Sequence, residues 1–196
     1  MKSYKLIGLT GATGAGKGEV RAVFEERGYK VIDADLLARE IMKNPIVLES
    51  VKTFFGEDTV VRGKLDRGLL AKRAFSSKDN TALLNSVTHP HITPLFLKEL
   101  KALSDGGADK IIFDAPQLFE SGLDIICDAV ISVTADEKIR LERIKARDNL
   151  TDEEAKRRIN AQFSDEYFRE NSDYTIENNS TPDELRARAE EIIYRL

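Results

Sequence analysis

The stretch Gly11-Ala12-Thr13-Gly14-Ala15-Gly16-Lys17-Gly18 decides how this chain folds. It follows a short apolar run, residues 5–10, which predicts a buried strand, and it opens into residues 19–24, which predict a helix. A strand, a glycine-rich loop and a helix in this order are the setting in which G-x-x-x-x-G-K binds phosphate. The glycines let successive backbone N–H groups converge on one anion, and Lys17 adds a positive charge that we expect to face solvent.

One position departs from this motif. The residue after the lysine is normally Ser or Thr, whose hydroxyl binds Mg²⁺, but here it is Gly18, and Glu19 then places a carboxylate close to the expected phosphates. Mg²⁺ keeps several waters and takes only one or two protein ligands, so a water can replace the hydroxyl. We therefore still expect phosphate binding by the loop residues Gly14, Ala15, Gly16, Lys17, Gly18 and Glu19.

Composition and charge are those of a soluble globular protein. The chain has 196 residues, 41% of them hydrophobic and 33% charged, which suffices for one domain with a substantial core. The net charge of -4 argues against general affinity for nucleic acids or membranes. The single cysteine, Cys127, excludes an internal disulfide, and no apolar run approaches the length of a membrane span. We expect one domain over residues 1–196, without a leader, located in the cytoplasm as a monomer or weak homo-oligomer.

Acidic residues follow two further predicted strands. Residues 29–32 run into Asp33 and Asp35, and residues 110–113 run into Asp114, as in a Walker-B-type strand. Residues i and i+2 of an extended chain share a face, so both carboxylates of the first pair can point to the sheet edge where α/β proteins bind ligands. Alternatively one of them caps the following helix. Both interpretations can hold, with one Asp capping and the other in the cleft.

The middle of the chain, residues 44–105, is predicted to be a helical insertion that forms the wall of a second substrate site. The expected elements are a helix opened by Asn44-Pro45, a loop from Gly56 to Gly63, a helix after Lys64-Leu65-Asp66-Arg67, a short helix over residues 79–87 and a long helix begun by Thr88-His89-Pro90. Pro90 would then occupy an early helical position, where its missing N–H costs nothing. His89 and His91 have no Cys or carboxylate cluster beside them, which favours a structural role over metal binding.

The last third adds strands over residues 128–133 and 172–178. Thr134, Thr151 and Thr181 each precede a Glu by three residues, which predicts three capping boxes and hence three helices. Strands that alternate with helices favour a parallel sheet with right-handed crossovers.

Two of these helices are rich in arginine. Arg140, Arg143 and Arg147 recur at helical spacing and so share one face, and the next helix carries Arg157, Arg158 and Gln162. Such a face is usually only solvated. In a phosphate-loop protein, however, two arginine-rich helices joined by a short turn are typical of a lid, because arginine contacts phosphate in a planar, bidentate way.

Nearly end to end, the chain resembles the dephospho-CoA kinases, P-loop enzymes akin to nucleoside-monophosphate kinases. The residues that carry the resemblance are Gly8-Leu9-Thr10-Gly11, Val31-Ile32-Asp33-Ala34-Asp35 with Ala38-Arg39, Leu65-Asp66-Arg67, His89-Pro90, Asp114-Ala115-Pro116-Gln117-Leu118-Phe119-Glu120, Arg143 with Arg147, Arg158-Ile159 with Gln162, and Ile176-Glu177-Asn178. The departures are Gly18-Glu19, where the family has two hydroxyl residues, and Gln117, where it usually has leucine.

The resemblance implies a three-layer α/β P-loop kinase fold with a five-stranded parallel sheet, a helical acceptor-binding insertion over residues 44–105 and a lid over residues 143–170. It implies ATP-dependent phosphorylation of the ribose 3′-hydroxyl of dephospho-coenzyme A, with ATP and Mg²⁺ as cofactors and no nucleic-acid or membrane partner. The implied residues are Asp35, Lys17 and Arg143 for catalysis, Asp114 for the metal, Arg147 and Asn178 beside the loop for the nucleotide, and Asp35, Arg39, His89, Pro116 and Leu118 for the acceptor.

Two alternatives remain at this stage. One is a related small-molecule kinase with another acceptor, against which the long helical insertion and the Asp33-Ala34-Asp35 motif weigh. The other is a non-catalytic nucleotide-binding protein, which the substitution at Gly18-Glu19 permits.

Overall fold

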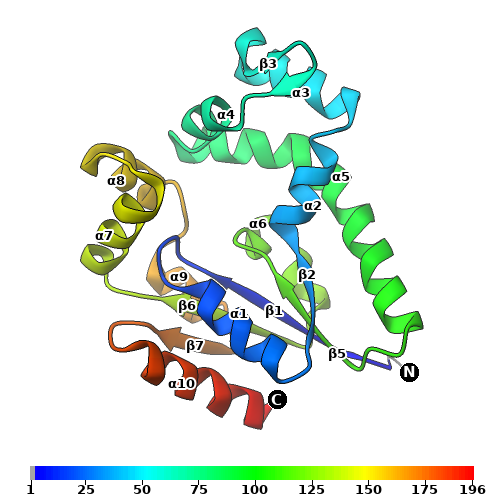
Figure 1. Cartoon of the computed structure of the whole chain (residues 1–196), viewed down its shortest axis with the longest axis vertical. Helices are drawn as coiled ribbons and strands as arrows, with labels where there is room; N and C mark the ends of the chain where they lie inside the picture. Colours follow the sequence, from blue (N-terminus) through cyan, green and yellow to red (C-terminus); the bar gives the residue numbers. More distant parts are fainter. Residues whose placement is uncertain (1–2) are drawn as a thin grey trace.

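A parallel sheet of five strands forms the centre of the molecule (Figure 1). The structure is a computed structural model that describes residues 3–196. The strand order is β2 (Lys30–Asp33), β5 (Lys110–Asp114), β1 (Lys5–Gly11), β6 (Ala129–Thr134) and β7 (Tyr174–Glu177), and every neighbouring pair is parallel. This confirms the predicted five-stranded sheet, with strand ends that differ from the predicted ones by one or two residues.

Both faces of the sheet are covered by helices, which gives three layers. Ile7 and Leu9 of β1 pack in one core with α1 (Lys17–Glu26) and α10 (Pro182–Arg195), whereas Leu6 packs in a second core on the opposite face. The alternation follows from the period of two along a strand. Because both faces are buried, the strands read as continuous apolar runs rather than as alternating ones.

After α2 (Ala34–Ile41), the predicted insertion over residues 44–105 forms α3 (Pro45–Phe55), the single turn η1 (Glu57–Thr59), α4 (Arg67–Ala74) and α5 (Lys78–Asp105) (Figure 1). It has a core of its own, built by Val47, Val51, Phe55, Leu70 and Ala74. Most of the insertion therefore packs around its own core rather than against the sheet.

Helix α5 is continuous, so the prediction of a short helix followed by one that starts at Thr88-His89-Pro90 was wrong. Pro90 and Pro94 lie inside the helix, where each removes a backbone hydrogen bond at a cost of about 3 kcal/mol. Partway along, the helix changes direction (Figure 1), as prolines cause helices to do. Its first half packs in the core of the insertion and its second half, with Phe96 and Leu100, against the sheet. Burial of both halves offsets the cost of the prolines.

Two local predictions also differ from the structure. The expected loop over residues 56–63 contains half of a small hairpin, β3 (Val60–Val61) paired with β4 (Lys64–Leu65). Arg62 and Gly63 both adopt positive φ, which closes a two-residue turn. Thr134 does not cap a helix, because pairing with Glu177 keeps it in the sheet. The next helix instead begins after Asp136, without a side-chain cap.

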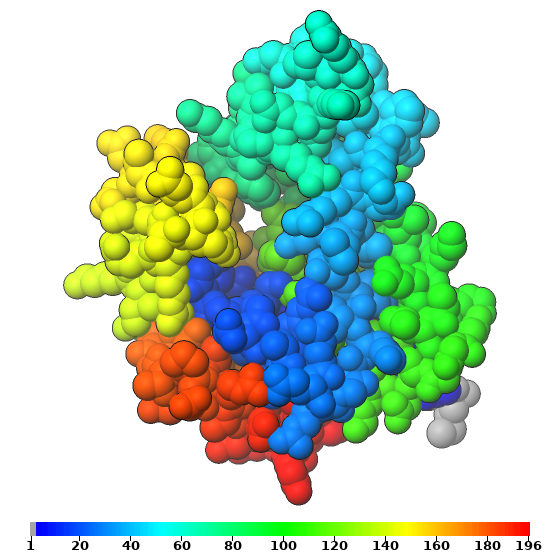
Figure 2. All heavy atoms as spheres, in the orientation of Figure 1, coloured from blue at the N-terminus to red at the C-terminus, as the bar shows by residue number. Residues whose placement is uncertain are grey.

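The remaining helices lie between the last three strands of the chain. Between β5 and β6 are α6 (Leu118–Ser121) and the turn η2 (Leu123–Ile126), and between β6 and β7 are α7 (Glu137–Asp148), α8 (Asp152–Asn160) and α9 (Asp165–Glu170). Thr151 forms the predicted capping box with Glu154, and the Thr181 side chain caps α10 by accepting from the Glu184 N–H, which is half of the box predicted there. In the space-filling view the surface is hollowed between α7–α8 and the insertion, above the glycine-rich loop (Figure 2). Within residues 3–196, no helix has both the length and the apolar character to cross a bilayer.

Candidate active site

The glycine-rich loop between β1 and α1 is shaped to bind an anion. Gly14 and Gly16 have φ values of 79° and 97°, which side chains rarely adopt. A Cβ at Gly14 would also lie 2.9 Å from the Arg140 carbonyl oxygen. Within residues 3–196, the N–H groups of Gly14, Gly16, Lys17 and Gly18 have no hydrogen-bond partner. These N–H groups and the positive end of the α1 dipole thus converge at one place.

Two cations and two carboxylates form a network beside this loop. Lys17 pairs with Asp114 at the end of β5, and Arg21 of α1 contacts both Asp114, at 3.3 Å, and Asp33, at 2.5 Å. Only 17% of the Lys17 side chain is exposed, so the expectation that it faces solvent was wrong. The attraction of Asp114 explains the difference. Sequence reasoning missed Arg21, although its place one turn after Lys17 puts it on the same face of α1.

Asp33 and Asp35 divide the two roles that the sequence left open. Asp33 caps α2, since its carboxylate accepts hydrogen bonds from the N–H groups of Asp35 and Leu36, at 2.9 and 3.1 Å. Burial would raise the pKa of Asp33, but the hydrogen bonds from Arg21 and from these two N–H groups outweigh it, and the pKa is lowered. Asp35 instead lines a cavity.

The pKa of Asp35 is shifted in the opposite direction. Desolvation by the surrounding protein raises it, and the negative charges of Asp33 and Asp114 add to this effect. Lys17 and Arg39 oppose the rise. A carboxyl group with a raised pKa, beside a phosphate-binding loop, is suited to accept a proton from a hydroxyl group.

Two adjoining cavities extend from Asp35 along α5. The smaller has a volume of about 340 Å³ and is lined by Thr13, Asp35 and Pro116, and the larger has a volume of about 820 Å³. His89 and Glu120 line both. Burial lowers the pKa of His89, against hydrogen bonds to Gln117 and to the Glu120 backbone. The combined space is large enough for an extended organic substrate.

Glu120 of α6 is a second residue to which sequence reasoning gave no role, although it stands in a motif that carries the family resemblance. Burial raises the pKa of its carboxyl group to about 7. Its Oε2 atom is buried and has no hydrogen-bond partner within residues 3–196. The sequence held no signal for this state, because Glu120 follows two apolar residues in what reads as a surface loop, and only the packing of distant segments desolvates it.

The three arginines of α7 play different parts. The Arg143 guanidinium lies against the loop, 3.4 Å from the Gly14 carbonyl oxygen and 3.3 Å from that of Asn178. Arg147 pairs with the neighbouring Asp148, and the charge of Asp35 contributes to raising its pKa. Arg140 is buried and donates to the Ala135 carbonyl oxygen and to Asp165.

The expectation that all three arginines form one phosphate-binding face is therefore corrected for Arg140, whose guanidinium is engaged by Ala135 before α7 and by Asp165 of α9. The segment after α8 is also joined to the glycine-rich loop, because the Gln162 side chain accepts a hydrogen bond of 2.7 Å from the Thr13 N–H.

The other predicted site residues fall into two groups. His89 and Pro116 lie in the cavity wall, and Arg39 is exposed on α2 but close enough for its charge to act on Asp35. Leu118, in contrast, is fully buried in the core against the sheet and lines neither cavity. The period of the short helix α6 turns it inward. Asn178 is also buried, and its side-chain amide donates to the Ala15 carbonyl oxygen at 2.7 Å, so it supports the loop.

The chemistry of the carboxylates bears on metal binding. Among the described residues 3–196, no group of three or more His, Cys, Asp or Glu side chains is arranged to hold a metal ion. Mg²⁺ that is bound together with nucleotide phosphates takes only one or two carboxylates. Asp114, at the carboxyl end of β5 beside the loop, fits that requirement.

Comparisons with known proteins agree with this geometry. A family model described as dephospho-CoA kinase matches residues 5–184. A dephospho-CoA kinase of Corynebacterium diphtheriae is 39% identical over 193 residues, which cover 97% of this chain and 96% of that protein. The corresponding protein of Fusobacterium nucleatum is 38% identical, with 96% of each chain covered.

Solved structures show the same fold. The Thermus thermophilus protein TT1252 has a TM-score of 0.80 and 32% identity, covering 100% of this chain and 99% of that one. A dephospho-CoA kinase from Campylobacter jejuni has a TM-score of 0.67 and 26% identity, covering 97% and 96%.

Proposed function

Because this chain belongs to the dephospho-CoA kinase family, we propose that it transfers the γ-phosphoryl group of ATP to the ribose 3′-hydroxyl of dephospho-coenzyme A, giving coenzyme A and ADP. This is the last step of coenzyme A synthesis. The observation that carries the proposal is the position of Asp35, which lines a substrate-sized cavity and interacts electrostatically with Lys17 of the phosphate loop.

The nucleotide side supplies charge and alignment. Phosphoryl transfer needs little covalent help from the protein, so its rate depends on positioning and on neutralising the phosphate oxygens. The unpaired N–H groups of Gly14, Gly16 and Gly18 would hold the β- and γ-phosphates together with Lys17. To do so, Lys17 exchanges its partner Asp114 for a phosphate oxygen.

Asp35 acts on the acceptor. Its carboxylate accepts a hydrogen bond from the 3′-hydroxyl and orients the oxygen for in-line attack. As the bond from this oxygen to the γ-phosphorus forms and the bond to the β-phosphate oxygen breaks, the hydroxyl proton passes to Asp35. Arg39 moderates the charge of Asp35 from the same helix.

Residues 143–170 would act as the lid and residues 44–105 as the acceptor-binding insertion. Arg143 is close to the loop already, and Arg147 is within electrostatic reach of Asp35. Closing the lid would place both guanidinium groups on the transferring phosphoryl group, where fixed positive charge stabilises the transition state.

Magnesium bound with ATP would neutralise phosphate charge, and Asp114 would hold it through a water molecule. Open space surrounds Gly18, where an added Cβ would have no atom within 4 Å, so a water can stand where the family has a hydroxyl.

We also place the reaction in the cytoplasm, with ATP and dephospho-coenzyme A as the only partners and the chain as a monomer or weak homo-oligomer.

A coupled assay for ADP tests the function. With ATP and Mg²⁺, dephospho-coenzyme A should support turnover at a rate far above that of a panel of free nucleosides and small alcohols. A nucleoside preferred over dephospho-coenzyme A would instead favour a related kinase. ATP binding without turnover on any acceptor would favour a non-catalytic nucleotide-binding protein.

A further inference from the structure

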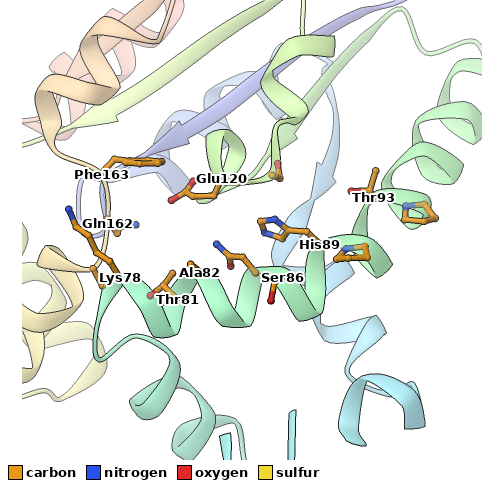
Figure 3. Close-up of a pocket in the computed structure, with 14 residues that line it drawn as sticks. Lys78, Thr81, Ala82, Ser86, His89, Thr93, Glu120, Gln162 and Phe163 are labelled. Atoms are coloured by element: carbon orange, nitrogen blue, oxygen red, sulfur yellow. The ribbon is translucent and has the colours of Figure 1, made fainter. Parts of the chain in front are cut away.

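The larger cavity is enclosed by segments that are far apart in the sequence (Figure 3). Helix α5 forms its floor with Thr81, Ala82 and Ser86, and the Glu120 carboxyl group and the Phe163 ring lie on the opposite side. Because the smaller cavity with Asp35 shares Glu120, a molecule whose hydroxyl group reaches Asp35 can extend a neighbouring ring system toward Glu120.

Phe163 offers a prearranged aromatic surface. Its ring stacks on Tyr167, with centroids 4.0 Å apart and planes inclined by 17°. Tyr167 does not line the cavity, whereas Phe163 does, so one face of the Phe163 ring is covered and the ring also borders the open space. A planar heteroaromatic ring that enters from the cavity can continue this stack.

Glu120 supplies hydrogen bonds at the same place. Its Oε2 atom is buried without a partner within residues 3–196, which is costly unless a ligand provides one. A protonated carboxyl group carries one donor and one acceptor side by side. The edge of adenine offers their complement, an acceptor at N1 next to donor hydrogens on N6. An ionised carboxylate can only accept, so it could bind N6 but not N1.

Building on the function proposed above, we infer that Glu120 and Phe163 form the subsite for the adenine base of the acceptor nucleotide: Phe163 stacks on the ring, and the Glu120 carboxyl group pairs with N1 and N6. The adenine of dephospho-coenzyme A adjoins the ribose whose 3′-hydroxyl must reach Asp35. This connectivity matches the junction of the two cavities at Glu120.

The charged groups around Glu120 permit it to be protonated near neutral pH. Lys78 of α5 borders the larger cavity, Asp35 of α2 and Arg158 of α8 border the smaller one, and His89 of α5 borders both. None of them contributes to the raised pKa of Glu120, which burial alone produces, to about 7. Base recognition should therefore weaken as the pH rises above about 7.

The test compares dephospho-coenzyme A with an analogue in which adenine N1 is replaced by C–H. At about pH 6 the wild-type KM for dephospho-coenzyme A should be about tenfold lower than the KM for the analogue. This factor corresponds to one well-made hydrogen bond in a desolvated site. At about pH 8.5 the difference should fall to about twofold or less. The ratio of the two KM values cancels any titration that affects both acceptors alike, including that of Asp35.

Two variants sharpen the result. In Glu120→Gln the amide can donate to N1 and accept from N6 at any pH, so the tenfold preference should persist at about pH 8.5. In Glu120→Leu the preference should be absent at both pH values, with thermal melting as the check that the chain folds. The inference is overturned if the wild type shows no preference, if its preference does not change with pH, or if Glu120→Leu retains it.

This outcome is separable from the proposed function. Turnover of dephospho-coenzyme A without an N1 preference would leave the function standing and remove the adenine subsite. If no acceptor is phosphorylated, calorimetric titration of the two compounds without ATP still measures the preference, and equal affinities at about pH 6 would overturn the subsite.

Discussion

The site has two walls. The nucleotide wall is formed by the glycine-rich loop, α1 and the end of β5, and the acceptor wall by α2, α5, α6 and the region after α8. The two walls differ in how their charged groups are paired. On the nucleotide side two cations and two carboxylates pair with one another: Lys17 pairs with Asp114, and Arg21 with Asp33 and Asp114. On the acceptor side, Asp35 and Glu120 both have raised pKa values, and the Oε2 atom of Glu120 has no partner within residues 3–196.

This difference shows which of the two walls has its charged groups paired before a ligand binds. A loop of converging N–H groups is a local device that one contiguous segment can build, and its ion pairs hold it in shape. The acceptor wall combines α2, α5, α6 and the region after α8, and the buried Oε2 atom of Glu120 is left for the substrate to satisfy. Ion pairs are thus concentrated on one side, and carboxyl groups with raised pKa values on the other.

The sharpest way to break the comparison is Asp35→Asn beside the matched control Asp33→Asn. Asp35→Asn should lower kcat by roughly 10²–10⁴-fold, the usual worth of general-base assistance, with ATP affinity nearly unchanged. Asp33→Asn keeps a helix-capping oxygen but loses its ion pair with Arg21, so it should mainly lower the melting temperature. Steady-state kinetics and thermal melting of both variants give the answer. Equal losses of kcat would contradict the division of roles.

On the nucleotide wall, Lys17→Ala should lower kcat/KM by roughly 10²–10³-fold, as loss of one charge-stabilising donor does. The melting temperature should change little, because Arg21 still accompanies Asp114. Lys101→Ala, at an exposed position on α5, is the control for a lost lysine. A marked loss of stability with activity intact would mean that Lys17 serves the fold and not the reaction.

Stability measured against pH sharpens the contrast on the acceptor wall. The pKa of Glu120 rises from its ordinary 4.5 to about 7 on folding, so between these values the folded state binds more protons than the unfolded state. The contribution of Glu120 to wild-type stability should therefore fall as the pH rises through this window. Relative to the wild type, Glu120→Gln should gain roughly 2–3 kcal/mol between about pH 5 and pH 8 in urea denaturation. A difference that is independent of pH would show that Glu120 is not held protonated.

The smallest effect is expected at Gly18→Ser. A side chain there meets no atom within 4 Å and needs no unusual φ, so the fold should be unchanged. The hydroxyl would replace one water at the metal and tighten the apparent Mg²⁺ affinity only a few-fold. Titration of ATP with and without Mg²⁺ measures this, with dephospho-coenzyme A affinity as the internal control. An unchanged metal affinity would mean that the departure at Gly18 is neutral.

Much of the architecture of the nucleotide wall could be predicted from the sequence because that wall is local. The loop, the capping role of one of the two aspartates and the acid at the end of β5 each follow from a few adjacent residues. The five strands followed from their continuous apolar runs. Arg21 was accessible by helical spacing and was overlooked.

The acceptor wall could not be predicted in this way. The bent helix α5 exists because two separate cores bury its two halves, which overrides the local cost of Pro90 and Pro94. Glu120 is desolvated by residues 30 or more positions away, such as His89 and Gln162, so no local pattern encodes its pKa. Leu118 stands in the motif of the family but turns into the core.

The central claim is transfer to one particular hydroxyl group, and phosphorus NMR of the product tests it most directly. After incubation of ATP, Mg²⁺ and dephospho-coenzyme A with the protein, the account predicts ADP and one new phosphomonoester signal that couples to the ribose 3′ proton. Asp35→Asn should give almost none of this signal in the same time. ADP without a new phosphomonoester, or a phosphate on another hydroxyl group, would contradict the account.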